Sequence, residues 1–80
     1  MNRAEIEQKI IGIIYEQKTL PENSIGPETP LQDVGIDSLD ALNILFQIEE
    51  TFAIAIPDDR ARAVRTVDDI ITAVVDLRVG

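Results

Sequence analysis

The sequence contains no cysteine, no histidine and no tryptophan. Without cysteine there is no disulfide framework, and without cysteine or histidine the usual ligands of a zinc site are missing. The N-terminal residues lack the continuous apolar segment of a signal peptide, because Glu5, Glu7 and Lys9 interrupt it. No apolar run approaches the length of a membrane span. We therefore expect a cytoplasmic protein that holds no metal ion.

The composition indicates a small folded protein. The 80 residues are 45% hydrophobic and 28% charged, which is typical of a globular chain and unlike a disordered one. A chain of this length supports one modest hydrophobic core. We therefore interpret residues 1–80 as a single domain.

The net charge of −8 is unevenly distributed along the chain. No basic residue lies between Lys18 and Arg60, so the middle of the sequence is acidic. Such a region does not favour nucleic acid, whose binding depends on Lys and Arg contacts to phosphates, and it is repelled by anionic membranes. A basic protein partner is its natural complement, because opposite fields steer association. The alternative is a solvated acidic face that only keeps the protein in solution.

Helical periodicity in the first part of the chain is followed by a long irregular segment. Recurring isoleucines predict an amphipathic helix over residues 4–16, with Asn2 as its N-cap. Residues 19–36 contain prolines and glycines that exclude a continuous helix, and long loops of this kind are often functional. The loop residues that we expect to contact the core are Ile25, Leu31, Val34 and Ile36.

A second helix starts at Asp37 and continues to about Thr51 or Phe52. The Asp37 carboxylate suits an N-cap, and Asp40 occupies the N3 position, where the helix dipole favours negative charge. Residues 58–64 can form one or two helical turns, and a last helix opens at Thr66. The predicted fold is all-α, a four-helix bundle with three main helices, one short helix and a long loop between the first and second helices.

The second helix is apolar on two sides. At about 100° per residue, one apolar group faces the core and another lies well over a right angle away. The first group is Ala41, Ile44, Leu45, Ile48 and Phe52, and the second is Leu39, Leu42 and Phe46. Either the second group contacts the long loop as core, or it is an exposed patch at which proteins dock. In the second interpretation Asp40, Glu49 and Glu50 form a charged rim around the patch.

Ser38 lies between two carboxylates at the start of this helix. A catalytic nucleophile is excluded, because there is no histidine base and the only lysines, Lys9 and Lys18, lie in or beside the first helix. A calcium loop is excluded because the nearby carboxylates lack the alternating spacing of an EF-hand. A plain helix-start residue remains one interpretation. The other is an attachment point, where the helix dipole favours a phosphoryl group and the neighbouring carboxylates oppose it.

Several motifs resemble those of the acyl carrier protein family. The T-V-x-D-I opening of the last helix is similar to that family, and the resemblance covers essentially the whole chain. The other matching motifs are T-P-L-x-D-x-G at 29–35, G-x-D-S-L-D at 35–40, E-E-x-F at 49–52 and I-P at 56–57.

The resemblance implies a carrier that is not an enzyme. The family's serine, which Ser38 matches, receives 4′-phosphopantetheine from coenzyme A through a separate phosphopantetheinyl transferase. The thiol of this covalent cofactor carries acyl groups as thioesters and presents them to acyl-loading and acyl-processing enzymes with basic docking patches. Some members of the family shelter the acyl chain in the core, and Ile44 and Ile48 would line that space here. The partner-docking residues that the resemblance implies are Asp37, Leu39, Leu42, Phe46, Glu49 and Glu50. We add Asp40 to them, because it belongs to the charged rim of the patch.

Three features depart from the pattern of fatty-acid carriers. Asn43 replaces a typical glutamate, Phe46 replaces a frequent methionine, and the short-helix region contains three arginines, Arg60, Arg62 and Arg65. We therefore expect a specialised carrier of fatty-acid, polyketide or related lipid biosynthesis. Its start at Met1 indicates a free-standing protein, which we expect to be a monomer. An aminoacyl or peptidyl carrier is the alternative, and an unmodified helical interaction domain is a further one.

Overall fold

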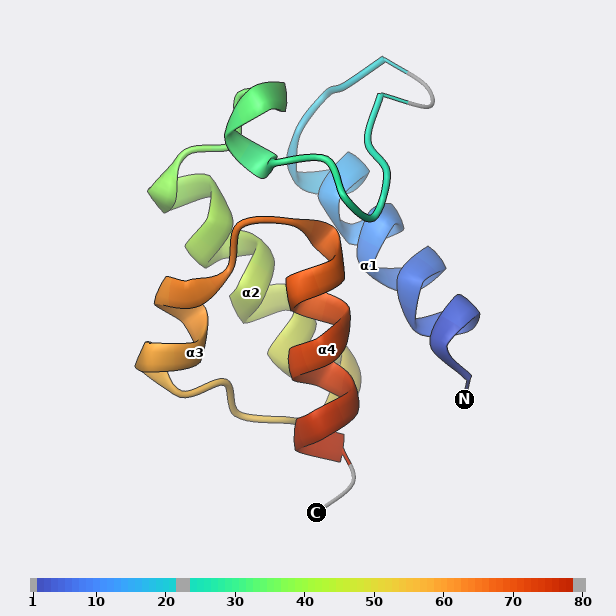
Figure 1. Ribbon diagram of the computed structural model, residues 1–80, viewed down its shortest axis with the longest axis vertical. Coiled ribbons are helices and arrows are strands. Elements are labelled where there is room, and N and C mark those ends of the chain that lie inside the picture. The colour runs from blue at the N-terminus through green and yellow to red at the C-terminus, as the bar shows by residue number, and fades with distance from the viewer. Residues whose placement is uncertain (1, 22–23, 79–80) are drawn as a thin grey trace.

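The computed structural model describes residues 2–21 and 24–78 (Figure 1). Within these residues the chain forms helices and no strand, so the prediction of an all-α bundle with a long first loop is confirmed. The elements are α1 (Arg3–Gln17), the 3-10 helix η1 (Leu31–Val34), α2 (Ser38–Phe52), α3 (Asp58–Ala63) and α4 (Val67–Arg78).

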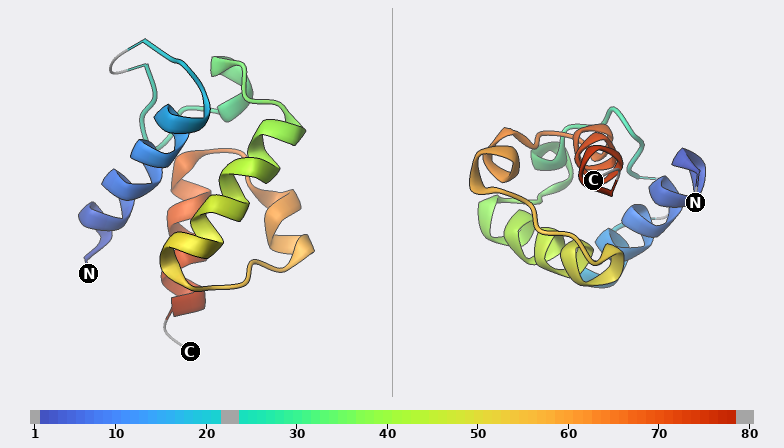
Figure 2. Two further views of the ribbon diagram at one scale, coloured as in Figure 1. Left: turned by 180° about the vertical axis from the view of Figure 1, so that it is seen from behind. Right: turned by 90° about the horizontal axis from the view of Figure 1, so that it is seen from below.

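The helices enclose one apolar core. Helix α1 packs against both α4 and α2, and the view along the bundle shows the helices arranged around a common centre (Figure 2). Each isoleucine that is fully buried there stabilises the fold by roughly 1.5–3 kcal/mol of hydrophobic free energy. The largest fully buried side chains are Ile10, Ile14, Ile44, Ile48, Val67, Ile70, Ile71 and Val74.

Side chains cap the starts of the main helices. The Asn2 side chain accepts a hydrogen bond from the Glu5 N–H at 2.9 Å, which confirms Asn2 as the N-cap of α1. At the start of α4, the Thr66 Oγ1 accepts from the Asp69 N–H, and the Asp69 carboxylate accepts from the Thr66 N–H. These bonds satisfy N–H groups that have no partner within a helix, so they fix where each helix begins.

The long loop crosses one end of the bundle between α1 and α2 (Figure 1). Its expected anchors contact the core, since Ile25, Leu31 and Ile36 are buried and Val34 is half-buried. The loop also contains the short helix η1, which the sequence did not predict because four residues are too few to show a helical period. Backbone bonds tie it to the start of α4: the Leu31 N–H donates to the Arg65 carbonyl at 2.9 Å.

Candidate functional site

The backbone between η1 and α2 fixes the position of Ser38. Gly35 ends η1 with a φ of 82°, a left-handed conformation that favours glycine. Ile36 is buried and anchors the chain, and the Asp37 carboxylate then accepts the Asp40 N–H at 2.9 Å. Asp37 is therefore the N-cap, as predicted, and Ser38 is the first residue of α2.

Ser38 is exposed at the N-terminal end of α2. Its hydroxyl is therefore open to another protein. A phosphoryl group added there would lie near the positive end of the helix dipole. The local geometry thus fits an attached phosphoester at this residue.

The second apolar group of α2 lies on the surface. Leu39 is 68% exposed, Leu42 is 44% exposed and Phe46 is 59% exposed. The interpretation in which these side chains pack beneath the loop is therefore wrong, while Ile44, Leu45 and Ile48 on the other side are buried as expected. We call Leu39, Leu42 and Phe46 the apolar patch. It starts immediately after Ser38.

Asp40 is half-buried and forms an ion pair inside the protein. The Lys18 Nζ donates to the Asp40 Oδ2 at 2.8 Å, joining the C-cap residue of α1 to the first turn of α2. This hydrogen bond lowers the pKa of Asp40 below its usual 3.8 and raises the pKa of Lys18 above its usual 10.5, so both groups are charged at neutral pH. Sequence reasoning missed Lys18, because no local pattern relates residues separated by such a loop.

The carboxylate of Glu49 also has a partner inside the fold. Its Oε2 accepts the Ile56 N–H at 2.7 Å, and its backbone carbonyl accepts the Ile54 N–H at 3.1 Å. Ala53, which lies between Glu49 and these two N–H groups in the sequence, ends α2 in a left-handed conformation with φ of 56°. Glu49 therefore holds the turn that leads to α3. The Asp37 and Glu50 side chains are exposed.

The arginines near α3 are mostly engaged within the protein. Arg60 pairs with Asp76 at 3.1 Å, and the Arg65 guanidinium donates to the backbone carbonyls of Arg62 and Val64. Arg62 is exposed and makes no ion pair with another described residue. Arg62 and Arg65 are therefore the exposed cations of this region that pair with no carboxylate among the described residues.

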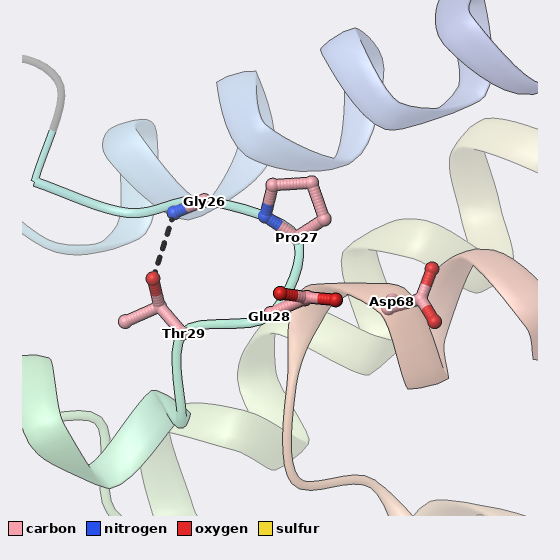
Figure 3. Close-up of a pocket in the computed structure, with 5 residues that line it drawn as sticks. All are labelled: Gly26, Pro27, Glu28, Thr29 and Asp68. Carbon is pink, nitrogen blue, oxygen red and sulfur yellow. Dashed lines mark hydrogen bonds between the residues drawn. The ribbon is translucent and has the colours of Figure 1, made fainter.

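A shallow pocket lies where the loop meets the start of α4 (Figure 3). Inside the loop, the Gly26 N–H donates to the Thr29 Oγ1 at 3.0 Å. Asp68 on α4 is already paired with Arg3. No α2 residue lines this pocket, so it is separate from Ser38. Its lining residues are Gly26, Pro27, Glu28, Thr29 and Asp68.

Comparison with known proteins identifies the family. The family model described as phosphopantetheine attachment site matches residues 8–74. An acyl carrier protein of Syntrophobacter fumaroxidans is 39% identical over 71 residues, which cover 88% of each chain. One of Thermosynechococcus vestitus is 33% identical over 72 residues, 89% of each chain. The chain belongs to the acyl carrier protein family.

Solved structures of acyl carrier proteins have the same fold. The crystal structure of an acyl carrier protein from Thermotoga maritima superposes with a TM-score of 0.84 at 26% identity, covering 96% of this chain and 91% of that one. A Toxoplasma-specific mitochondrial acyl carrier protein gives 0.82, also at 26% identity, covering 99% of this chain and 93% of that one.

Family membership confirms the general function inferred from the sequence. Acyl carrier proteins hold 4′-phosphopantetheine covalently, carry acyl groups on it and are not catalysts. Fatty-acid biosynthesis is their usual role. The matched region 8–74 includes the start of α2, where the exposed Ser38 hydroxyl is chemically suited to a phosphodiester. Within the described residues, no helix is both long and apolar enough to span a membrane.

Proposed function

We propose that this chain is a specialised acyl carrier domain that bears its 4′-phosphopantetheine arm on Ser38. The observation that carries this assignment is the exposed Ser38 hydroxyl at the start of α2, directly followed by the apolar patch. The transferase that modifies Ser38 has to approach this end of α2, where the patch begins. The arrangement serves both attachment and delivery.

The attachment reaction needs only a reachable hydroxyl from this protein. The Ser38 Oγ bonds to the phosphorus of coenzyme A that carries the pantetheine, and the pyrophosphate bond breaks to release adenosine 3′,5′-bisphosphate. We place the base that takes the hydroxyl proton on the phosphopantetheinyl transferase, because this chain has no histidine and the neighbouring Asp37 and Asp40 carboxylates already accept hydrogen bonds within the fold. The thiol of the attached arm then supplies the thioester chemistry that a chain without cysteine lacks.

A mass measurement tests the assignment. The apo protein is incubated with coenzyme A and a promiscuous phosphopantetheinyl transferase, and the intact mass is recorded. We expect the mass of one arm to be added to the wild type and not to Ser38→Ala. The chain offers one matched control, since Ser24 is its only other serine and its hydroxyl oxygen is buried. Ser24→Ala should accept the arm, and an unmodified wild type would refute the assignment.

The docking surface for partner enzymes follows from the exposed side chains of α2. Its centre is the apolar patch, because a contiguous exposed apolar surface marks a protein interaction site and aromatic residues such as Phe46 are enriched at interfaces. Asp37 and Glu50 supply exposed charges at its two ends. Asp40 and Glu49 belong to its rim, with carboxylates that are hydrogen-bonded inside the fold.

The cargo and partners are expected to differ from those of a general fatty-acid carrier. Phe46 makes the patch bulky, Asn43 is neutral where fatty-acid carriers typically have a glutamate, and Arg62 is an exposed cation on α3. We therefore propose a dedicated set of acyl-loading and acyl-processing enzymes in fatty-acid, polyketide or related lipid biosynthesis. Mass spectrometry of the arm on protein from the native host identifies the cargo, and an aminoacyl group there would instead indicate an aminoacyl carrier. The cytoplasmic location and the monomeric state stay predictions.

A further inference from the structure

The part of α2 that adjoins Ser38 contains very few ionisable groups. From Ser38 to Gln47 the helix has one, Asp40. The exposed side chains of this stretch are the three of the apolar patch, Ser38 itself and the neutral Asn43. The other carboxylates of the docking surface lie at its ends, Asp37 before the helix and Glu49 and Glu50 in its last turns.

The single charge of this stretch is neutralised within the protein. The 2.8 Å contact between the Lys18 Nζ and the Asp40 Oδ2 is a charge-assisted hydrogen bond, and both side chains are about two-thirds covered. Lys18 comes from the end of α1, so it reaches Asp40 from outside the helix that carries the patch. Together the pair leaves the stretch of α2 from Ser38 to Gln47 without net charge, while Asp37 stays as an exposed charge in front of it.

We propose that Lys18 is a specificity-determining residue, which by pairing with Asp40 fits this surface to partner enzymes with an apolar, uncharged docking depression. This inference rests on the proposed function, since it concerns enzymes that act at the Ser38 arm. A partner with a lysine or arginine opposite Asp40 would have to desolvate that cation against a carboxylate that is already paired. A partner with an apolar surface covers Leu39 and Phe46 and leaves the ion pair intact. Basic residues of a partner are useful only toward Asp37 and the C-terminal end of α2.

Two lysine substitutions test this with equal changes in net charge. Lys18→Met frees the Asp40 charge, while Lys9→Met removes a lysine that is exposed on α1 and outside the ion pairs found among the described residues. The probe is a phosphopantetheinyl transferase with a basic carrier-binding surface, acting with coenzyme A on each apo protein. The measured quantities are kcat and KM at low and high salt. Thermal unfolding of each variant shows whether the fold is retained.

We expect Lys18→Met to raise kcat/KM at low salt by about fourfold. This is the factor that corresponds to the attraction between the freed Asp40 charge and a cation of the transferase roughly 5 Å away in water. The gain should appear as a lower KM, because surface charge acts on association. It should disappear at about 1 M salt, where the Debye length is only about 3 Å and the charges are screened from each other. Lys9→Met should stay close to the wild type, and Lys18→Arg should restore its behaviour. Asp40→Asn, which leaves Lys18 unpaired, should lower kcat/KM.

The outcomes separate this inference from the proposed function. If the wild type accepts the arm but Lys18→Met and Lys9→Met behave alike, Lys18 does not tune recognition and the inference is wrong. The same conclusion follows if Asp40→Asn, a second variant of the same pair, raises kcat/KM. If the wild type accepts no arm, both the function and the inference are overturned. A gain in kcat with unchanged KM would also contradict the electrostatic mechanism.

Discussion

Two residues that are two positions apart on α2 give a sharp test of its division into a buried and an exposed side. Ile48 is completely buried, whereas Phe46 is 59% exposed. We consider Ile48→Val, which removes one methylene from the core, and Phe46→Ala, which truncates a surface aromatic ring. The two changes should act on different properties of the protein.

The expected magnitudes follow from burial. Ile48→Val should lower the free energy of unfolding by about 0.5–1.5 kcal/mol, because the core relaxes only partly around the lost group. Phe46→Ala should change it by no more than about 0.5 kcal/mol, because a surface side chain makes few packing contacts. In the transferase reaction we expect the opposite order, with the larger loss of kcat/KM for Phe46→Ala. Loss of an aromatic anchor at an interface costs more than about 1 kcal/mol, or roughly fivefold in kcat/KM.

Urea unfolding and transferase kinetics measure both properties on the same samples. With a slope near 1 kcal/mol per molar for so small a protein, Ile48→Val should move the urea midpoint by about 1 M and Phe46→Ala by less than half of that. The kinetic loss should be confined to Phe46→Ala. If Phe46→Ala shifts the midpoint as far as Ile48→Val and leaves the kinetics unchanged, the patch is packing surface and the reasoning fails.

Further predictions concern single positions. Gly12→Ala should stabilise the protein by about 0.5–1 kcal/mol in thermal unfolding, because an added Cβ meets nothing within 4 Å in the middle of α1. Ala53→Gly should stabilise it by about 0.5 kcal/mol, since glycine relieves the left-handed conformation but loses more entropy on folding. Glu49→Ala should cost about 1 kcal/mol or more, because the N–H of residue 56 loses its acceptor. The lowered pKa of Asp40 means that its pairing with Lys18 stabilises the fold fully above pH 3.8 and progressively less as the pH falls through that lowered pKa. Urea unfolding from pH 7 to pH 2 should therefore show the difference between the wild type and Lys18→Met disappearing in acid.

The helices could be predicted from sequence because their determinants are local. Isoleucines at helical spacing, the Asn2 cap and the Asp37 cap all act within one turn of the residues that they affect. The Asp37 cap in turn makes Ser38 the first residue of α2. These local determinants place Ser38 at the start of α2, and the resemblance to the family makes it the candidate attachment residue.

The partners of the acidic side chains could not be predicted, because they come from other elements. Asp40 meets Lys18 only after the loop has brought α2 back along α1. Glu49 meets the Ile56 N–H only after the chain has turned at Ala53. A helical wheel gives the angle of a carboxylate but not the group that reaches it from outside the helix. The sequence therefore predicts only a docking role for both residues, and their bonds within the fold come from the structure.

The exposure of the patch depends on what the rest of the chain leaves uncovered. Helix α3 has six residues and contributes no fully buried side chain, so it cannot cover α2 along its length. Leu39, Leu42 and Phe46 follow one another at spacings of three and four, which places them on one side of α2 once Asp37 has fixed its start. The cap that presents Ser38 thus also sets the register of the patch. An enzyme that reaches an arm on Ser38 therefore meets an apolar surface whose position relative to the arm is set by the helix itself.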